Sequence, residues 1–340
     1  MKKIHSLIFF SFLLLVFHSC VKEDFYDNTR RGNYEALWRI MNEHYCFFDY
    51  KKQELGVDWD DVHARYAYKI NEDMTNTQLF EVLCEMLSEL QDGHVNLAAS
   101  FDFGRNWSFY EDHPENYNDS IAKLYLGHNY SIASGLKYVT LPDNIGYVRC
   151  ESFAEGIGDG NVSAMLNALA SCNALIIDVR GNGGGQLTKA QAFASHFTNE
   201  KLLVGYVSHK TGKGRNDFSS PKAVNLDPAS NGIRWQKPVV VLTNRAVYSA
   251  ANDFVKCMKQ CPNVTIMGDQ TGGGSGMPFN SELPNGWTVR YSAVVFYDKD
   301  MQHTEFGIQP DIFLEMSGAD LMQKKDTYIE KAREYLSKSE

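Results

Sequence analysis

The sequence predicts an α/β fold in which a mostly parallel sheet follows a small helical region. Continuous apolar runs rich in β-branched residues, such as 174–179 and 239–242, are typical of strands buried on both faces of a sheet. Segments with apolar residues at steps of three and four alternate with these runs, which indicates helices that connect parallel strands. Residues 33–90 instead hold three consecutive helical patterns.

The order of elements follows from the same patterns. Asp58 and Thr75 stand before the second and third helical patterns, and both residue types are favourable N-caps. Beyond them we expect strands at 146–150, 174–179, 202–207, 239–242 and 264–267, helices at 162–170, 187–197 and 249–258, a hairpin arm at 287–297 and a terminal helix at 321–336.

These patterns divide the chain into segments. A linking segment of about 45 residues is shorter than the roughly 50 to 250 residues of an independent domain, so it is expected to hold only strands and loops. The predicted segments are a signal peptide (1–19), a tether (20–32), a helical domain (33–97), the linking segment (98–142), the α/β core (143–318) and a C-terminal helix (319–340).

The first twenty residues predict export and a lipid anchor. Two lysines precede an apolar run, Leu7–Phe17, that is too short to cross a bilayer and is typical of a secretory signal. Ser19 followed by Cys20 resembles a bacterial lipobox, so we expect Cys20 to be lipidated and to attach the protein to the outer membrane, on its periplasmic or outer side. The residues 22–24, Lys-Glu-Asp, resemble a signal for the outer face, or form an ordinary charged tether.

Composition excludes several partners. The formal net charge of −9 argues against nucleic acid, whose phosphates require a basic surface. Besides Cys20 there are six cysteines, with no C-x-x-C pair and no zinc-ligand spacing. We therefore expect no metal and no cofactor.

Ser249 stands where a buried strand ends and a helix begins. The first N–H groups of a helix have no partner within it, so a serine there is either an N-cap or a nucleophile beside donors for an oxyanion. Glycines at four of the five positions 181–185 expose further N–H groups, and the segment lacks the Gly-Lys-Ser/Thr ending of a phosphate-binding loop. A second glycine-rich loop, 268–276, is either a turn or a close approach to a bound chain.

Two further residues carry little specificity by themselves. His94 follows the turn signal Asp92-Gly93, and a histidine in that position is commonly a surface residue. Glu305 precedes Gly307 and a proline-fixed turn, and exposed glutamates are common.

The ordered set of motifs is similar to that of the S41 serine peptidases, which include the carboxy-terminal processing proteases and the tricorn core protease. The resemblance covers about residues 33–318 and implies a catalytic core of the ClpP/crotonase type. The matching motifs are Asp178-x-Arg180-x-Asn182-x-Gly184-Gly185, Ser249-Ala250, Gly268-x-x-Thr271-Gly272-Gly273 and Gly307-Ile-x-Pro310-Asp311.

The resemblance implies specific roles. The processing proteases use a lysine from a Thr-x-Gly-Lys-Gly loop, but glycine stands at that place here. The tricorn-like branch takes a histidine from a Leu-x-Asp-Gly-His pattern, which points to His94, and a glutamate that points to Glu305. The resemblance thus implies Ser249, His94 and Glu305 as catalytic residues, Ala250 with Gly183 or Gly184 as the oxyanion hole, and Thr271, Gly272 and Gly273 as substrate-binding residues.

The function expected is hydrolysis of unfolded or extended polypeptides. The linking segment is too short for the PDZ domain that many relatives insert, which makes selection of free C-termini doubtful. The alternative is a peptide- or lipid-binding protein on the same fold, as in the interphotoreceptor retinoid-binding proteins, or a hydrolase with a vestigial site. The sequence does not define an oligomeric state.

Overall fold

The computed structural model describes residues 26–105, 111, 113–154 and 156–338. The predicted signal peptide 1–19 and Cys20 lie outside these residues. The first helix, α1 (Arg30–His44), begins inside the segment predicted as a tether. Within the described ranges, no helix is long and apolar enough to cross a membrane.

A seven-stranded sheet forms the core, and its fold class is the one predicted. Five neighbouring strands are parallel, and two antiparallel strands complete one side. In spatial order the strands are β13 (Ile312–Phe313), β10 (Val264–Gly268), β9 (Val239–Thr243), β6 (Ala174–Asp178), β5 (Ile145–Cys150), β4 (Leu136–Thr140) and β3 (Ser131–Ala133).

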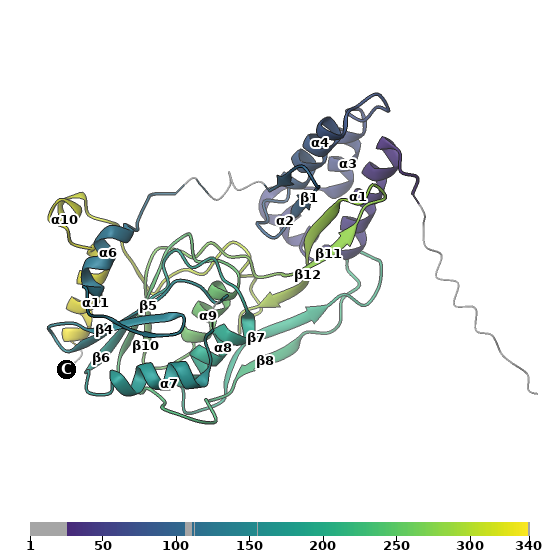
Figure 1. The fold of residues 1–340 in the computed structure, drawn as a ribbon. Helices are drawn as coiled ribbons and strands as arrows, with labels where there is room; N and C mark the ends of the chain where they lie inside the picture. The colour runs from purple at the N-terminus through teal and green to yellow at the C-terminus, as the bar shows by residue number, and fades with distance from the viewer. Residues whose placement is uncertain (1–25, 106–110, 112, 155, 339–340) are drawn as a thin grey trace, which may run out of the picture.

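Helices cover both faces of this sheet, which is why its central strands are apolar along most of their length. Val239 and Val241 belong to the core on one side, and Val240 and Leu242 to the core on the other. Full burial of each such side chain contributes roughly 1.5–3 kcal/mol. The first side packs against α7 (Asp159–Ala168), α8 (Leu187–Ala194) and α9 (Ala250–Met258), and the second against α6 (Asp119–Leu126) and α11 (Thr327–Ser337) (Figure 1).

A second, antiparallel sheet joins the helical region to the core. Its long strand β12 (Thr288–Tyr297) pairs with β7 (Leu202–His209) in the core and with β1 (Asn96–Ala98) beside the helices. In the second pairing Leu97 lies opposite Val289. Figure 1 shows β11 and β12 extending from the core to the helices. The other strands are β2 (Phe103–Gly104), β8 (Lys222–Leu226) and β11 (Met277–Glu282).

The helical region completes its hydrophobic core with this sheet. Trp287, Val289 and Tyr291 pack among the buried side chains of the helices, so the region is not built from residues 33–97 alone. Its later helices are α2 (Phe48–Leu55), α3 (Trp59–Ala67) and α4 (Asn76–Ser88).

Two local predictions were wrong. The linking segment 98–142 contains helix α6 as well as strands and loops. The predicted helix 321–336 is two helices, α10 (Gly318–Met322) and α11, because Asp326 turns away from helical geometry and caps α11 by accepting from Tyr328 and Ile329 N–H.

A buried ion network explains the first motif. The Arg180 guanidinium is fully buried, with its Nη2 2.7 Å from Asp178 Oδ2 and its Nη1 3.0 Å from Asp326 Oδ1. Asn182 continues the network by donating to Cys150 O (3.1 Å) and accepting Gly184 N–H (2.9 Å). The ion pairs fix the start of the glycine-rich loop, because a buried charge that lost its partner would cost several kcal/mol. The hydrogen bonds of Asn182 hold the middle of the loop.

Candidate active site

Ser249 occupies a strained position between strand β9 and helix α9. Its backbone has φ 56° and ψ −123°, a region that non-glycine residues rarely adopt and that costs on the order of 1–3 kcal/mol. Although Ser249 is the N-cap residue of α9, its side chain makes no capping hydrogen bond in the described structure. The hydroxyl is therefore available for another partner.

That partner is His94. Its Nε2 lies 3.0 Å from Ser249 Oγ, although the two residues are 155 positions apart. His94 is 4% exposed, so the expectation of a surface residue does not hold. Its ring lies 5.2 Å from that of Tyr248.

Asp92 fixes the turn that carries His94. One carboxylate oxygen accepts the His94 N–H (2.7 Å), and the other accepts from the hydroxyls of Tyr45 (3.1 Å) and Ser292 (2.9 Å). The residue after helix α1, the turn and strand β12 thus meet at one buried carboxylate, which holds the histidine segment against the core.

The electrostatic setting keeps the imidazole neutral. Burial lowers the pKa of His94 to about 4, the charge of Asp92 opposes that shift, and Arg290 adds to it. A neutral imidazole can accept the Ser249 proton at Nε2. Its proton then lies on Nδ1, which has no hydrogen-bond partner among the residues that the structure describes.

The glycine-rich loop 181–185 packs against the serine. A Cβ on Gly184, whose φ is +100°, would lie 2.8 Å from Ser249 Cβ and 2.9 Å from Ala250 N, so only glycine allows this approach. Gly184 N–H already donates to Asn182 Oδ1. Of the two glycines considered as oxyanion donors, Gly183 is the better candidate, together with Ala250 at the start of α9.

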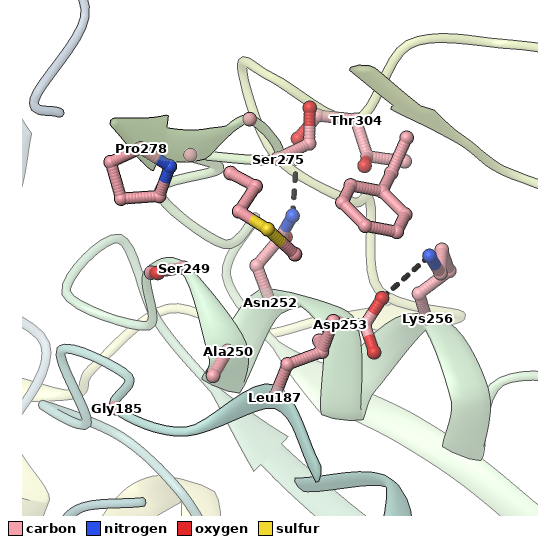
Figure 2. Close-up of a pocket in the computed structure, with 14 residues that line it drawn as sticks. Gly185, Leu187, Ser249, Ala250, Asn252, Asp253, Lys256, Ser275, Pro278 and Thr304 are labelled. Atoms are coloured by element: carbon pink, nitrogen blue, oxygen red, sulfur yellow. Dashed lines mark hydrogen bonds and ion pairs between the residues drawn. The ribbon is translucent and has the colours of Figure 1, made fainter. Parts of the chain in front are cut away.

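A pocket of about 210 Å³ opens beside Ser249 (Figure 2). Part of its wall is the loop before β11, and part is one face of α9. Its lining residues are Gly185, Leu187, Ser249, Ala250, Asn252, Asp253, Lys256, Gly274, Ser275, Gly276, Met277, Pro278, Phe296 and Thr304.

Comparison with known sequences now identifies the family. The family described as "Peptidase family S41" matches residues 144–314, about half of the chain, and the "Tricorn protease C1 domain" matches residues 26–88. The chain belongs to peptidase family S41.

Curated relatives of this S41 chain match only in part. Carboxy-terminal processing protease CtpA of Bacillus subtilis (strain 168) is 26% identical over 178 residues, which are 51% of this chain and 36% of that protein. Tricorn protease of Thermoplasma acidophilum is 26% identical over 167 residues, 48% of this chain and 14% of that protein. The match thus spans about a third or less of these relatives.

Solved structures match over most of the length. A structure from Parabacteroides merdae ATCC 43184, described as a candidate peptidase, is 50% identical, covers 91% of this chain and 97% of that chain, and has a TM-score of 0.86. Mature CPAF has a TM-score of 0.66 at 15% identity, covering 91% of this chain and 96% of that chain, a likeness of fold alone.

Glu305 does not complete a hydrogen-bonded triad in the S41 site. It is 2% exposed rather than a surface residue, but no hydrogen bond joins it to His94 within the described ranges. Its carboxylate oxygens instead accept from Lys51 Nζ (3.2 Å) and from Ser275 N–H (2.9 Å). Burial and the charge of Asp92 raise the pKa of Glu305 to about 8, against the opposing effect of Lys51.

The three predicted substrate-binding residues are not part of the pocket lining. Thr271, Gly272 and Gly273 are buried and do not line the pocket, because their polar groups are used inside the protein. Thr271 Oγ1 donates to Asn252 Oδ1 (2.6 Å), Gly272 N–H donates to Val247 O (2.8 Å), and Gly273 O accepts Ser249 N–H (2.8 Å). The next three residues, 274–276, line the pocket instead.

Lys51 is the residue that sequence reasoning missed. It is fully buried in helix α2, and its ammonium also donates to Gln91 O (3.0 Å) and lies 4.2 Å from the centre of the Phe306 ring. It therefore links the helical region, the histidine turn and Glu305. No pattern separates it from the adjacent, exposed Lys52.

We expect Lys51→Met to lower the free energy of unfolding by about 3–5 kcal/mol, because it removes one partner of a buried ion pair and leaves Glu305 Oε1 and Gln91 O without the donor they share. Lys52→Met, one residue away and exposed, should leave the free energy of unfolding close to that of wild type. Urea unfolding of both variants measures this. Equal stability of the two variants would contradict the role given to Lys51, and Lys51→Met/Glu305→Gln should recover part of the loss.

Proposed function

We propose that this protein is a serine-type endopeptidase in which Ser249 is the nucleophile and His94 the general base. The observation that carries the proposal is the 3.0 Å separation of His94 Nε2 and Ser249 Oγ. The strained backbone of Ser249 and the neutral state of the imidazole support it, because a nucleophile and a neutral base within hydrogen-bond reach are what acyl transfer requires.

The proposed reaction has two halves. His94 removes the Ser249 proton as the oxygen attacks a peptide carbonyl, and the imidazolium then protonates the leaving amine. A water molecule, activated by the same imidazole, releases the acyl group from Ser249. The N–H groups of Ala250 and Gly183 are proposed to bind the oxyanion, at roughly 3–4 kcal/mol per donor.

Glu305 is proposed as the third catalytic residue, acting through its charge rather than through a hydrogen bond to the imidazole. When His94 becomes positive, the charge of Asp92, which already raises the His94 pKa, stabilises it, and ionisation of Glu305 becomes more favourable and adds a second negative charge. Glu305 also holds the pocket loop, since its backbone oxygen accepts Gly274 N–H (2.9 Å) and its side chain accepts Ser275 N–H.

Extended or unfolded polypeptides are the proposed substrates. Strand β11, which begins at the pocket residues Met277 and Pro278, pairs on one side with β12, and no other described strand pairs with it. A free strand edge binds a chain by main-chain hydrogen bonds only when that chain is extended.

The alternative is a protein that binds peptides or lipids on this fold without cleaving them. A wild type that binds an unfolded polypeptide but leaves it intact, just as Ser249→Ala does, would favour this alternative.

We expect Ser249→Ala to lower kcat/KM on reduced, carboxymethylated lactalbumin by roughly 10⁴-fold or more, because no other group can form the acyl intermediate. The matched control is Ser171→Ala, an exposed serine distant in sequence from the site, which should keep wild-type activity. Release of fragments, followed by mass spectrometry, measures the effect. Equal cleavage by wild type and Ser249→Ala would exclude Ser249 as the nucleophile.

The pH profile should show the lowered pKa of His94. The base works only when neutral, so activity is present above its pKa in the folded protein and is lost as the pH falls through that value. Since burial lowers this pKa to about 4, the acid limb of kcat/KM should lie near pH 4 rather than at the ordinary value of 6.5. An acid limb between pH 6 and 7 would show that the imidazole is not buried as described.

We also propose that the protein is exported and anchored to the outer membrane through lipidated Cys20. The support is the signal-like segment 1–19 and the Ser19-Cys20 pair. Cell fractionation should place wild type with membranes and Cys20→Ala in the soluble fraction. Wild-type protein that is wholly soluble would end this proposal.

A further inference from the structure

A buried ion pair closes the end of the pocket that lies away from Ser249. Lys256 Nζ lies 2.6 Å from Asp253 Oδ1, and the two residues are 3% and 9% exposed. Both line the pocket, and Figure 2 shows them on α9 at the opposite end from Ser249. A pair of charges at the end of a small pocket restricts which substrate side chains can bind there.

The direction of α9 places the pair within reach of a bound side chain. Ala250, Asp253 and Lys256 follow at steps of three along one face of the helix, starting beside the nucleophile. Helical side chains lean toward the N-terminus of their helix, so the long Lys256 chain lies back over Asp253 and toward Ser249. A substrate side chain beside the scissile bond would therefore point along α9 toward the ammonium.

The ammonium has hydrogen-bonding capacity left over. A lysine ammonium has three N–H donors, and Asp253 uses one of them. The described residues supply no second acceptor, and the Phe296 ring lies 5.5 Å away. Asp253 has less capacity left to accept hydrogen bonds, because its Oδ2 also accepts from Gln191 Nε2 (3.4 Å). The pocket end thus offers donors but no net charge.

We propose that the Asp253–Lys256 pair selects the residue on the acyl side of the cleaved bond, and that it favours a long neutral side chain ending in an acceptor, glutamine above all. The inference rests on the proposed peptidase function and specifies its substrate. The walls contributed by Leu187, Met277 and Phe296 accommodate the methylene groups, and the amide oxygen of glutamine accepts from Lys256.

Charged side chains are disfavoured because the pair is already balanced. A glutamate would add a second carboxylate beside one lysine, and a lysine would add a second ammonium beside one aspartate. In either case one buried charge is left without a full partner, which is unfavourable in a pocket of low polarity. A leucine fits the walls but leaves the ammonium donors unused.

Breaking the pair should therefore invert the charge preference. Asp253→Asn leaves Lys256 without its counter-ion, so a substrate glutamate becomes the missing partner. Lys256→Met leaves Asp253 unpaired, so a substrate lysine or arginine takes that place. A double variant, Asp253→Asn/Lys256→Met, removes both charges and should no longer distinguish glutamine from leucine.

The experiment compares kcat/KM for four peptides that differ only in having Gln, Leu, Glu or Lys before the cleaved bond. Wild type should prefer Gln to Glu and to Lys by about tenfold or more. Asp253→Asn should raise the ratio of kcat/KM for the Glu peptide to that for the Gln peptide by about tenfold or more. Lys256→Met should raise the corresponding ratio for the Lys and Gln peptides by about tenfold or more. The matched control is Lys259→Met, which changes the lysine that directly follows α9, outside the pocket, and should leave all ratios unchanged.

The outcomes separate the two proposals. A wild type that cleaves none of the peptides, nor unfolded protein, contradicts the peptidase function itself. Cleavage with ratios that stay the same in Asp253→Asn and Lys256→Met overturns the specificity inference alone. If a single variant fails to fold, the double variant decides, because it leaves no unpaired charge. Loss of the preference for Gln over Leu supports the inference, and an unchanged preference overturns it.

Discussion

The contact between His94 and Ser249 is the interaction on which the site depends, and it joins parts of the chain 155 positions apart. Neither residue could hold that geometry alone. The pairing of β12 with both β1 and β7 fixes the helical region to the core, and the buried carboxylate of Asp92 ties the histidine turn to α1 and β12. Any change that loosens this second sheet should therefore act on the catalytic geometry as well as on stability.

Two glycine-rich loops meet at the serine, and each uses glycine for a different purpose. Gly184 lets the loop after β6 touch Ser249 and Ala250. Gly273, whose Cβ would lie 1.8 Å from Glu305 O, lets the loop after β10 pass between the serine and the glutamate. The strained backbone of Ser249 is held by hydrogen bonds to this second loop, so the cost of the strain is offset by its surroundings.

The core and the pairing of Ser249 with His94 were predictable, whereas the contacts between buried charges were not. Runs such as 239–242 identify strands because both of their faces are buried, and a family pattern singled out His94. The burial of Lys51 and Lys256 was not predicted, because a buried lysine has the same sequence signal as an exposed one. Each of these lysines is buried because the fold brings a carboxylate next to it. Asp253 pairs with Lys256, and Glu305, 254 positions away in the sequence, pairs with Lys51. Helix α6 and the break before α11 were missed although Asn118 and Asp326 cap these helices locally, because the interpretation of these segments followed apolar patterns rather than caps.

The most direct test of the account is the rate at which a fluorophosphonate modifies the protein, with and without His94. The account predicts a single adduct on Ser249, and modification slowed by about 100-fold or more in His94→Ala, because the imidazole must take the serine proton. Adducts on another residue, or equal rates in a His94→Ala variant that remains folded, would contradict the claim that His94 activates Ser249.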